Sequence, residues 1–162
     1  MKGGGRCKMK EVEVIKVALD LEFKTPVVLL KEKKGNKKLP IWMGLPEARA
    51  IVLAMKDLSS SSFSTVDLIK SLIKKFKSCV DKVIINELKN DTYYAKIFLK
   101  MNEEILDVDA RPSDAIALAL KFKAPIYIDE DRIAAREKPI DEREVSEFKE
   151  KLKDIKPEDF SF

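Results

Sequence analysis

Residues Val108–Leu120 read VDARPSDAIALAL, and this stretch predicts how the fold is organised. Apolar and acidic residues alternate up to Ala110, which is typical of a strand, and the alanine-rich run after Pro112 is typical of a buried helix. Proline suits the first helical position because the N–H that it lacks would have no partner there. The stretch therefore predicts a strand that passes directly into a helix, with polar residues crowded at the junction.

Strand-like and helix-like patterns continue on both sides of this junction. An alternation from Ile15 to Phe23 predicts a strand at 11–23, followed by strands at 26–33 and 37–43 around a turn at 34–36. Helices are predicted at 45–57, opened by Pro46, and from a capping box at 64–67 to residue 76, with a serine loop at 59–62 between them. Further strands are predicted at 80–89 and 92–101, as a hairpin, at 104–110, and at 125–128 after the helix at 112–122.

The order of these segments predicts an α+β fold, with one main mixed or antiparallel sheet, packed helices and a C-terminal amphipathic helix. That last helix is expected at 141–155, where Val145, Phe148, Leu152 and Ile155 recur at helical spacing. Its apolar stripe fits docking on the same chain or on a partner. We expect a domain at residues 9–136 and a helical extension at 137–162, and the apolar surplus of the helices predicts a homodimer.

The composition of the 162 residues favours one globular domain. Charged residues make up 37% of the chain, yet the net charge is only +4, which is not typical of a strong nonspecific nucleic-acid binder. Abundant lysine and glutamate predict heat stability. With no long apolar run and no signal-peptide pattern, we expect no membrane contact and a cytoplasmic location. Cys7 and Cys79 lack metal-ligand spacing and are expected to be plain thiols.

The chain contains no histidine. A Ser-His-Asp triad, a histidine base and a histidine metal ligand are therefore excluded for this sequence. Any catalysis would use carboxylates, lysine, tyrosine, a thiol, or a metal ion held by oxygen ligands.

The polar residues of the junction predict a site for metal and phosphate. Strand side chains alternate, so Asp107 and Asp109 point to the same face, about 7 Å apart, and Arg111 joins them if the chain stays extended. Ser113 and Asp114 would then lie in the first helical turn, among N–H groups that favour anions. Such oxygen ligands could hold Mg²⁺ or Mn²⁺ beside a guanidinium that binds phosphate, and phosphodiester cleavage uses both.

We therefore assign catalytic roles to Asp109, Arg111, Ser113 and Asp114, and metal binding to Asp109, Asp114 and Glu47. A structural interpretation stays open for each of them. Asp114 could only cap its helix, Arg111 could brace Asp109, and Glu47 could simply meet the dipole of its own helix.

Other features are interpreted first as structural. Trp42 is expected in the core or an interface, with base stacking as the alternative, and the lysine runs at 31–34 and 74–77 are expected to be solvated. The segments 46–54 and 112–119 resemble each other, since each passes a proline and an acidic residue before a small-residue helix. They are either a pseudo-repeat or two solutions to one packing problem.

Three motifs in order resemble the bifunctional nuclease family, also called the DNase/RNase domain. They are Leu39-Pro40-Ile41-Trp42-Met43-Gly44 with Glu47-Ala48, then Asp109-Ala110-Arg111-Pro112-Ser113-Asp114-Ala115-Ile116, and Ala124-Pro125-Ile126. The resemblance covers roughly residues 10–135. It implies an α+β fold and, as for characterised plant members, cleavage of DNA and RNA. We thus expect a metal-assisted nuclease of low sequence specificity, or alternatively a non-catalytic regulatory module that binds a phosphate ligand or a protein.

One position departs from the family pattern. Many relatives carry a Pro-x-Thr-His-Asp-like run before the second helix, and Phe63-Ser64-Thr65-Val66-Asp67 stands there in this chain. Thr65 and Asp67 match this run, while Val66 replaces the histidine. Either that histidine is dispensable or this member has lost the activity.

Overall fold

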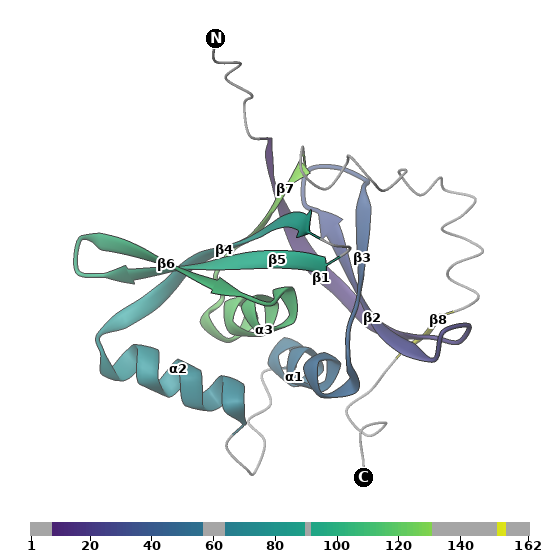
Figure 1. The fold of residues 1–162 in the computed structure, drawn as a ribbon, viewed down its shortest axis with the longest axis horizontal. Coiled ribbons are helices and arrows are strands. Elements are labelled where there is room, and N and C mark those ends of the chain that lie inside the picture. Colours follow the sequence, from purple (N-terminus) through teal and green to yellow (C-terminus); the bar gives the residue numbers. More distant parts are fainter. Residues whose placement is uncertain (1–7, 57–63, 90–91, 131–151, 155–162) are drawn as a thin grey trace.

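The computed structural model describes residues 8–56, 64–89, 92–130 and 152–154, and every structural statement here concerns those residues. Three helices lie on one side of a twisted sheet (Figure 1). The elements in chain order are β1 (Met9–Asp20), β2 (Thr25–Glu32), β3 (Lys38–Trp42), α1 (Leu45–Met55), α2 (Thr65–Lys75), β4 (Ser78–Lys89), β5 (Thr92–Met101), β6 (Glu104–Ala110), α3 (Pro112–Phe122), β7 (Ile126–Asp129) and β8 (Leu152–Asp154). This arrangement confirms the α+β prediction.

The sheet consists of two antiparallel units joined by β7. Its strand order is β3-β2-β1-β7-β4-β5-β6, and β8 pairs with the end of β1. Within each unit, β1–β2–β3 and β4–β5–β6, neighbouring strands are antiparallel, as the predicted hairpins require. The short β7 is antiparallel to β1 and parallel to β4, which makes the sheet mixed.

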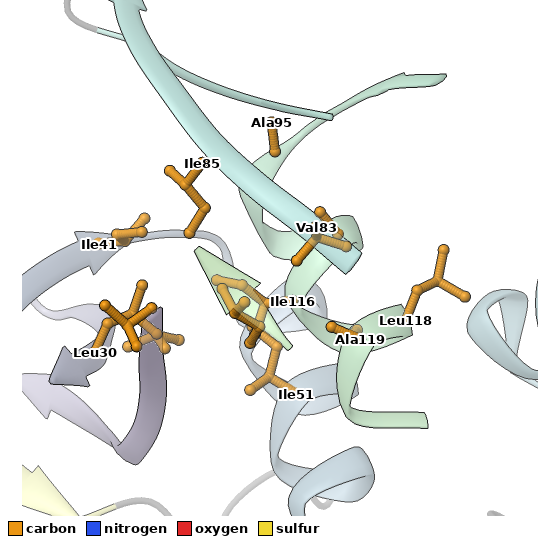
Figure 2. Close-up of a cluster of buried hydrophobic side chains, with 14 of the residues drawn as sticks. Leu30, Ile41, Ile51, Val83, Ile85, Ala95, Ile116, Leu118 and Ala119 are labelled. Carbon is orange, nitrogen blue, oxygen red and sulfur yellow. The ribbon is translucent and has the colours of Figure 1, made fainter. Parts of the chain in front are cut away.

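One hydrophobic core lies between the sheet and the helices. Ile51 of α1 and Ile116 of α3 are fully buried, and they point toward Leu30 and Ile85 of the sheet (Figure 2). Burying one such side chain contributes roughly 1.5–3 kcal/mol. The alanines at alternate positions of α3 are also fully buried, and their small size lets α3 approach the sheet closely. These alanines are Ala115, Ala117 and Ala119.

The predicted alternation in β1 was wrong in its second half. The strand ends at Asp20, and Leu21 and Phe23 lie exposed in the turn that follows. Val12 and Val17 both reach the core although five positions separate them, because β1 shifts register against β2 between these residues. Such a shift moves every later side chain to the opposite face, which a strict period of two does not reveal.

The predicted C-terminal helix was wrong at its end. Leu152–Asp154 form β8, antiparallel to Ala18–Asp20 of β1. On β1, β7 pairs with Met9–Val12 alone within the described residues, so the far end of this strand presents backbone groups that β8 satisfies. Residues 141–151, the serine loop at 59–62, the turn at 90–91 and the proposed domain boundary at 136–137 lie outside the described residues.

Candidate functional site at the start of α3

Arg111 lies where β6 ends and α3 begins, as the sequence predicted. Its backbone is extended, with φ −72° and ψ 148°, and its side chain binds two carboxylates. Nε and Nη2 donate to the two oxygens of Asp114 at 2.8 and 3.2 Å, and Nη1 donates to Oε1 of Glu47 at 2.9 Å. The guanidinium therefore joins the first turns of α3 and α1 through a planar fork of hydrogen bonds.

The place of Glu47 depends on the residue before its helix. Gly44 is the N-cap of α1, and a Cβ built on Gly44 would lie 2.3 Å from Oε2 of Glu47. Only a residue without a side chain leaves that space to the carboxylate. Gly44 and Arg111, the N-caps of α1 and α3, supply no side-chain capping bond within the described part of the chain. Pro46 and Pro112 each remove one N–H from these helix starts, and the other N–H groups of the two first turns remain for an anion.

The ion cluster of Arg111, Glu47 and Asp114 is open to solvent. The Arg111 side chain is 64% exposed, and its two partners are partly exposed. Both carboxylates raise the pKa of the guanidinium above its usual value, the hydrogen bonds to Asp114 being the largest cause and the bond to Glu47 the next. Exposed ion pairs of this kind stabilise a fold by only about 0–1 kcal/mol each, so a competing anion can replace them.

Asp109 has a different partner. Asp107 and Asp109 lie on one face of β6, as expected, and Nζ of Lys96 on β5 contacts them at 2.5 and 3.6 Å. The hydrogen bond to Asp107 is the largest cause of a raised pKa at Lys96, and Lys96 lowers the pKa of Asp107. Arg111 therefore braces Asp114 and Glu47, not Asp109. The β5–β6 register, which pairs Lys96 with Asp109, was the signal needed to find this lysine.

The predicted site residues are thus brought together only in part. Glu47 and Asp114 converge on one cation, the guanidinium of Arg111, whereas Asp109 contacts Lys96. Among the described residues, no group of three or more His, Cys, Asp or Glu side chains is arranged to hold a metal ion. Ser113, the second residue of α3, is buried. The metal ligands and catalytic roles assigned from the sequence stay predictions.

Trp42 has a structural contact that the sequence did not reveal. Its Nε1 donates to Oδ2 of the buried Asp20 at 3.0 Å, although the indole itself is partly exposed. The other oxygen of Asp20 accepts the N–H groups of Glu22 and Phe23 at 3.0 and 3.3 Å. The tryptophan thereby ties β3 to the turn after β1, but at 41% exposure it does not lie in the core, so that part of the prediction was wrong.

The position of the missing family histidine is far from Arg111. Val66 is the second residue of α2, and its side chain is buried in the core. Its neighbour Asp67 forms the predicted capping box with Ser64, and Oδ1 of Asp67 also contacts Nζ of Lys121 at 3.0 Å. Lys121 lies near the end of α3, about 15 Å along the helix from Arg111 at 1.5 Å per residue. A histidine at position 66 would therefore belong to the opposite end of α3.

A sequence profile of the bifunctional nuclease domain matches residues 28–141, a range that contains Glu47, Arg111 and Asp114. The chain belongs to this family. The resemblance of the three motifs is confirmed by that match. Among the described residues, no helix is long and apolar enough to cross a membrane.

Relatives of this bifunctional nuclease domain fall into two groups. An uncharacterized protein of Mycobacterium tuberculosis is 35% identical over 164 residues, which cover 94% of this chain and 98% of the relative. Bifunctional nuclease 1 of Oryza sativa subsp. japonica is 27% identical and Bifunctional nuclease 2 of the same plant is 28% identical. The plant alignments cover 63% and 64% of this chain but only 32% and 33% of the rice proteins. This chain therefore matches about a third of the length of each rice protein.

Proposed function

We propose that this bifunctional nuclease domain cleaves phosphodiester bonds in DNA and RNA with low sequence specificity, and that Arg111 positions the phosphate. The observation that carries the proposal is the exposed guanidinium of Arg111, which lies where two helices begin without side-chain caps. A guanidinium and the N–H groups of a helix start both bind phosphate oxygens well. The names of the rice relatives support the same class of reaction.

In this proposal, phosphate competes with the carboxylates for Arg111. The fork that now binds Asp114 and Glu47 has the geometry that a phosphate also uses. When a phosphate takes the guanidinium, the carboxylates of Glu47 and Asp114 lose their counter-ion. Two neighbouring carboxylates without a counter-ion repel each other and favour either a proton or a cation between them.

The proposal includes a divalent metal ion beside Arg111. Mg²⁺ or Mn²⁺ would be held by Glu47 and Asp114, which already share one cation, and the ion would supply charge stabilisation and an activated water. Asp109 remains a proposed third ligand, since its side chain is 85% exposed and only loosely held by Lys96. Ser113 would orient the phosphate through its hydroxyl. As now arranged, the carboxylates fit the guanidinium, so metal binding requires Arg111 to move.

The test is a cleavage assay on single-stranded and double-stranded DNA and RNA, with Mg²⁺, with Mn²⁺ and with a chelator. We expect Arg111→Ala to lower cleavage at least about tenfold, as the loss of a charged hydrogen bond to phosphate would. Arg49, which is exposed on α1, gives the matched control, and Arg49→Ala should leave cleavage unchanged. Full activity in Arg111→Ala would exclude the proposed role.

A second function is favoured by one observation. Arg111 already binds two carboxylates, and the described residues contain no group of three acidic side chains arranged to hold a metal ion. This arrangement suits a non-catalytic regulatory module whose arginine exchanges its partners for a phosphate ligand or a protein. In that case the chain would bind oligonucleotide or inorganic phosphate without cleaving it, and Arg111→Ala would abolish the binding.

Two properties inferred from composition belong to the proposal as well. The lysine and glutamate content supports a heat-stable protein, and a thermal unfolding curve measures this directly. A reducing, cytoplasmic location also belongs to the proposal, and Cys79, which is a free, exposed thiol among the described residues, is compatible with it. Fractionation of the source cells with an antibody to the chain would test the location.

A further inference from the structure

The outer edge of β6 is unusually open for a sheet edge. In the described part of the chain β6 pairs only with β5, so its other side presents a row of backbone N–H and C=O groups. The opposite edge, β3, is protected by Pro40 and by its buried side chains. β6 is longer, contains neither proline nor lysine, and has exposed side chains from Glu104 to Asp109. Edges of this kind pair with another strand unless something blocks them.

Apolar side chains of β6 are exposed on both of its faces. Ile105, Leu106 and Val108 are 50%, 44% and 46% exposed. Leu106 pairs with Leu99 of β5, which packs against the core, so Leu106 continues a row of core residues out to the edge. A second strand beside β6 would bury this row.

The charges of β6 select one arrangement of two identical strands. If two copies pair antiparallel with Leu106 opposite Leu106, then Ile105 faces Asp107 and Glu104 faces Val108. Glu104 and Asp107 then lie opposite apolar residues, and only Asp109 faces an acidic residue, Glu103 of the turn just before the partner's β6. A two-fold axis at Asp107 would place two carboxylates opposite each other, and an axis at Val108 would place Asp107 opposite Asp109, both of which are unfavourable.

We propose that β6 is the interface for a second copy of this chain, paired antiparallel with the two-fold axis at Leu106. The pairing joins the two sheets into one, and the row Leu99–Leu106 continues into the same row of the partner. The self-complementary pattern of acidic and apolar residues is the reason to choose a second copy over a different protein. The inference does not depend on the nuclease activity, because Arg111 lies outside the paired strand.

Disulfide trapping tests the register. Residues directly opposite in an antiparallel pair have Cα atoms about 4.5–5.5 Å apart, within the range of a disulfide. In a chain with Cys7→Ser and Cys79→Ser, mild oxidation of Leu106→Cys should give a covalent dimer. Val108→Cys is the matched control on the same face, since the two copies of position 108 would lie about 14 Å apart along the strands. A cross-link at position 108 and none at 106 would contradict the proposed register.

Light scattering tests the dimer itself. We expect the unmodified chain to show twice its mass of 18.5 kDa, and Leu106→Glu to show a monomer with an unchanged circular dichroism spectrum. Leu21→Glu, in the exposed turn after β1, should remain a dimer. A monomeric wild type up to millimolar concentration would overturn the proposal. So would a dimer that Leu72→Glu, on the exposed face of α2, dissociates while Leu106→Glu does not.

Discussion

The three helices of the domain place an acidic residue at the same position and use it in two ways. Glu47, Asp67 and Asp114 are each the third residue of a helix, three positions after the N-cap. In α2 the carboxylate turns back onto its own N-cap, where it accepts the N–H and the hydroxyl of Ser64. In α3 the carboxylate also turns back to its N-cap residue but binds the guanidinium of Arg111, and in α1 it reaches the same guanidinium from the neighbouring helix.

The residue at the N-cap accounts for this difference. Ser64 offers a hydroxyl that accepts the N–H of Asp67 at 3.2 Å, which closes a reciprocal capping box. Gly44 and Arg111 offer no such hydroxyl, so the carboxylates that follow them bind a guanidinium instead of closing a capping box. The identity of the N-cap residue thus distinguishes α2, whose first turn stabilises the helix, from α1 and α3, whose first turns can bind a ligand.

The largest loss of stability should come from removing the lysine that contacts the capped start of α2. Lys121 is only 8% exposed and Asp67 20%, so Lys121→Ala leaves a largely buried carboxylate without its cation. We expect a loss of about 2–4 kcal/mol in the free energy of unfolding, measured with urea. Lys74→Ala, at an exposed position of α2, should change stability by less than about 0.5 kcal/mol. An equal effect of both substitutions would show that the contact with Asp67 contributes nothing specific.

A smaller loss should follow from removing the cap itself. Ser64→Ala deletes the hydroxyl that accepts the N–H of Asp67, and such losses cost about 1 kcal/mol. Urea unfolding at neutral pH measures the change. No change would mean that the reciprocal box is not what holds this helix start.

Acid should weaken the same helix start. Its hydrogen bond with Ser64 is the largest cause of a lowered pKa at Asp67, and the contacts with Lys121 lower it further. A carboxyl whose pKa is lower in the folded chain stabilises the fold above its unfolded pKa, near 3.8, and loses that contribution as the pH falls through the folded pKa. Urea unfolding from neutral pH down to strongly acidic pH should therefore show a larger decrease for the wild type than for Asp67→Asn. Parallel curves would contradict this.

Gly44→Ser should give α1 the side-chain cap that it lacks. The new Cβ would displace the Glu47 carboxylate from Arg111, and the new hydroxyl could cap α1. We expect Gly44→Ser to be about 0.5–1 kcal/mol more stable than Gly44→Ala, which has the Cβ without the hydroxyl. With Glu47 displaced, both variants should bind inorganic phosphate or an oligonucleotide about two- to fivefold more tightly, as the loss of one exposed ion pair would allow. Unchanged affinity would show that Glu47 does not compete for Arg111.

The smallest effect on stability should come from Asp109→Asn. The side chain is 85% exposed and lies 3.6 Å from Lys96, so the loss should stay below about 0.5 kcal/mol. The cleavage assay on the same preparation then reports on the proposed metal ligand alone. Full activity would remove Asp109 from the site, and lost activity with intact stability would keep it.

Sequence reasoning succeeded where the deciding contacts are local. The capping box of α2 needs only the residues from Ser64 to Asp67. The pair of Arg111 with Asp114 was missed although it spans only three positions, because Arg111 was instead expected to brace Asp109. The contact of Arg111 with Glu47 joins residues 64 positions apart, and it exists because α1 packs beside α3. The spacing of apolar residues in either helix does not predict that the two helices pack together.

The same distinction holds in the sheet. Alternation placed Asp107 and Asp109 on one face correctly, but the lysine between them lies on the neighbouring strand. In β1 the predicted alternation failed where the strand ends at Asp20, and the register shift between Val14 and Lys16 leaves no mark in the composition of the strand. The contacts that the sequence did not predict depend on which strands are neighbours and on their register.

The position of β7 sets the order in which this domain can assemble during synthesis. The unit β1–β2–β3 is complete at Trp42 and the unit β4–β5–β6 at Ala110, so each can pair before Ile126 leaves the ribosome. Only β7 then bridges β1 and β4. Until the four residues of β7 arrive, both units expose an inner edge, and exposed strand edges of a growing chain favour aggregation.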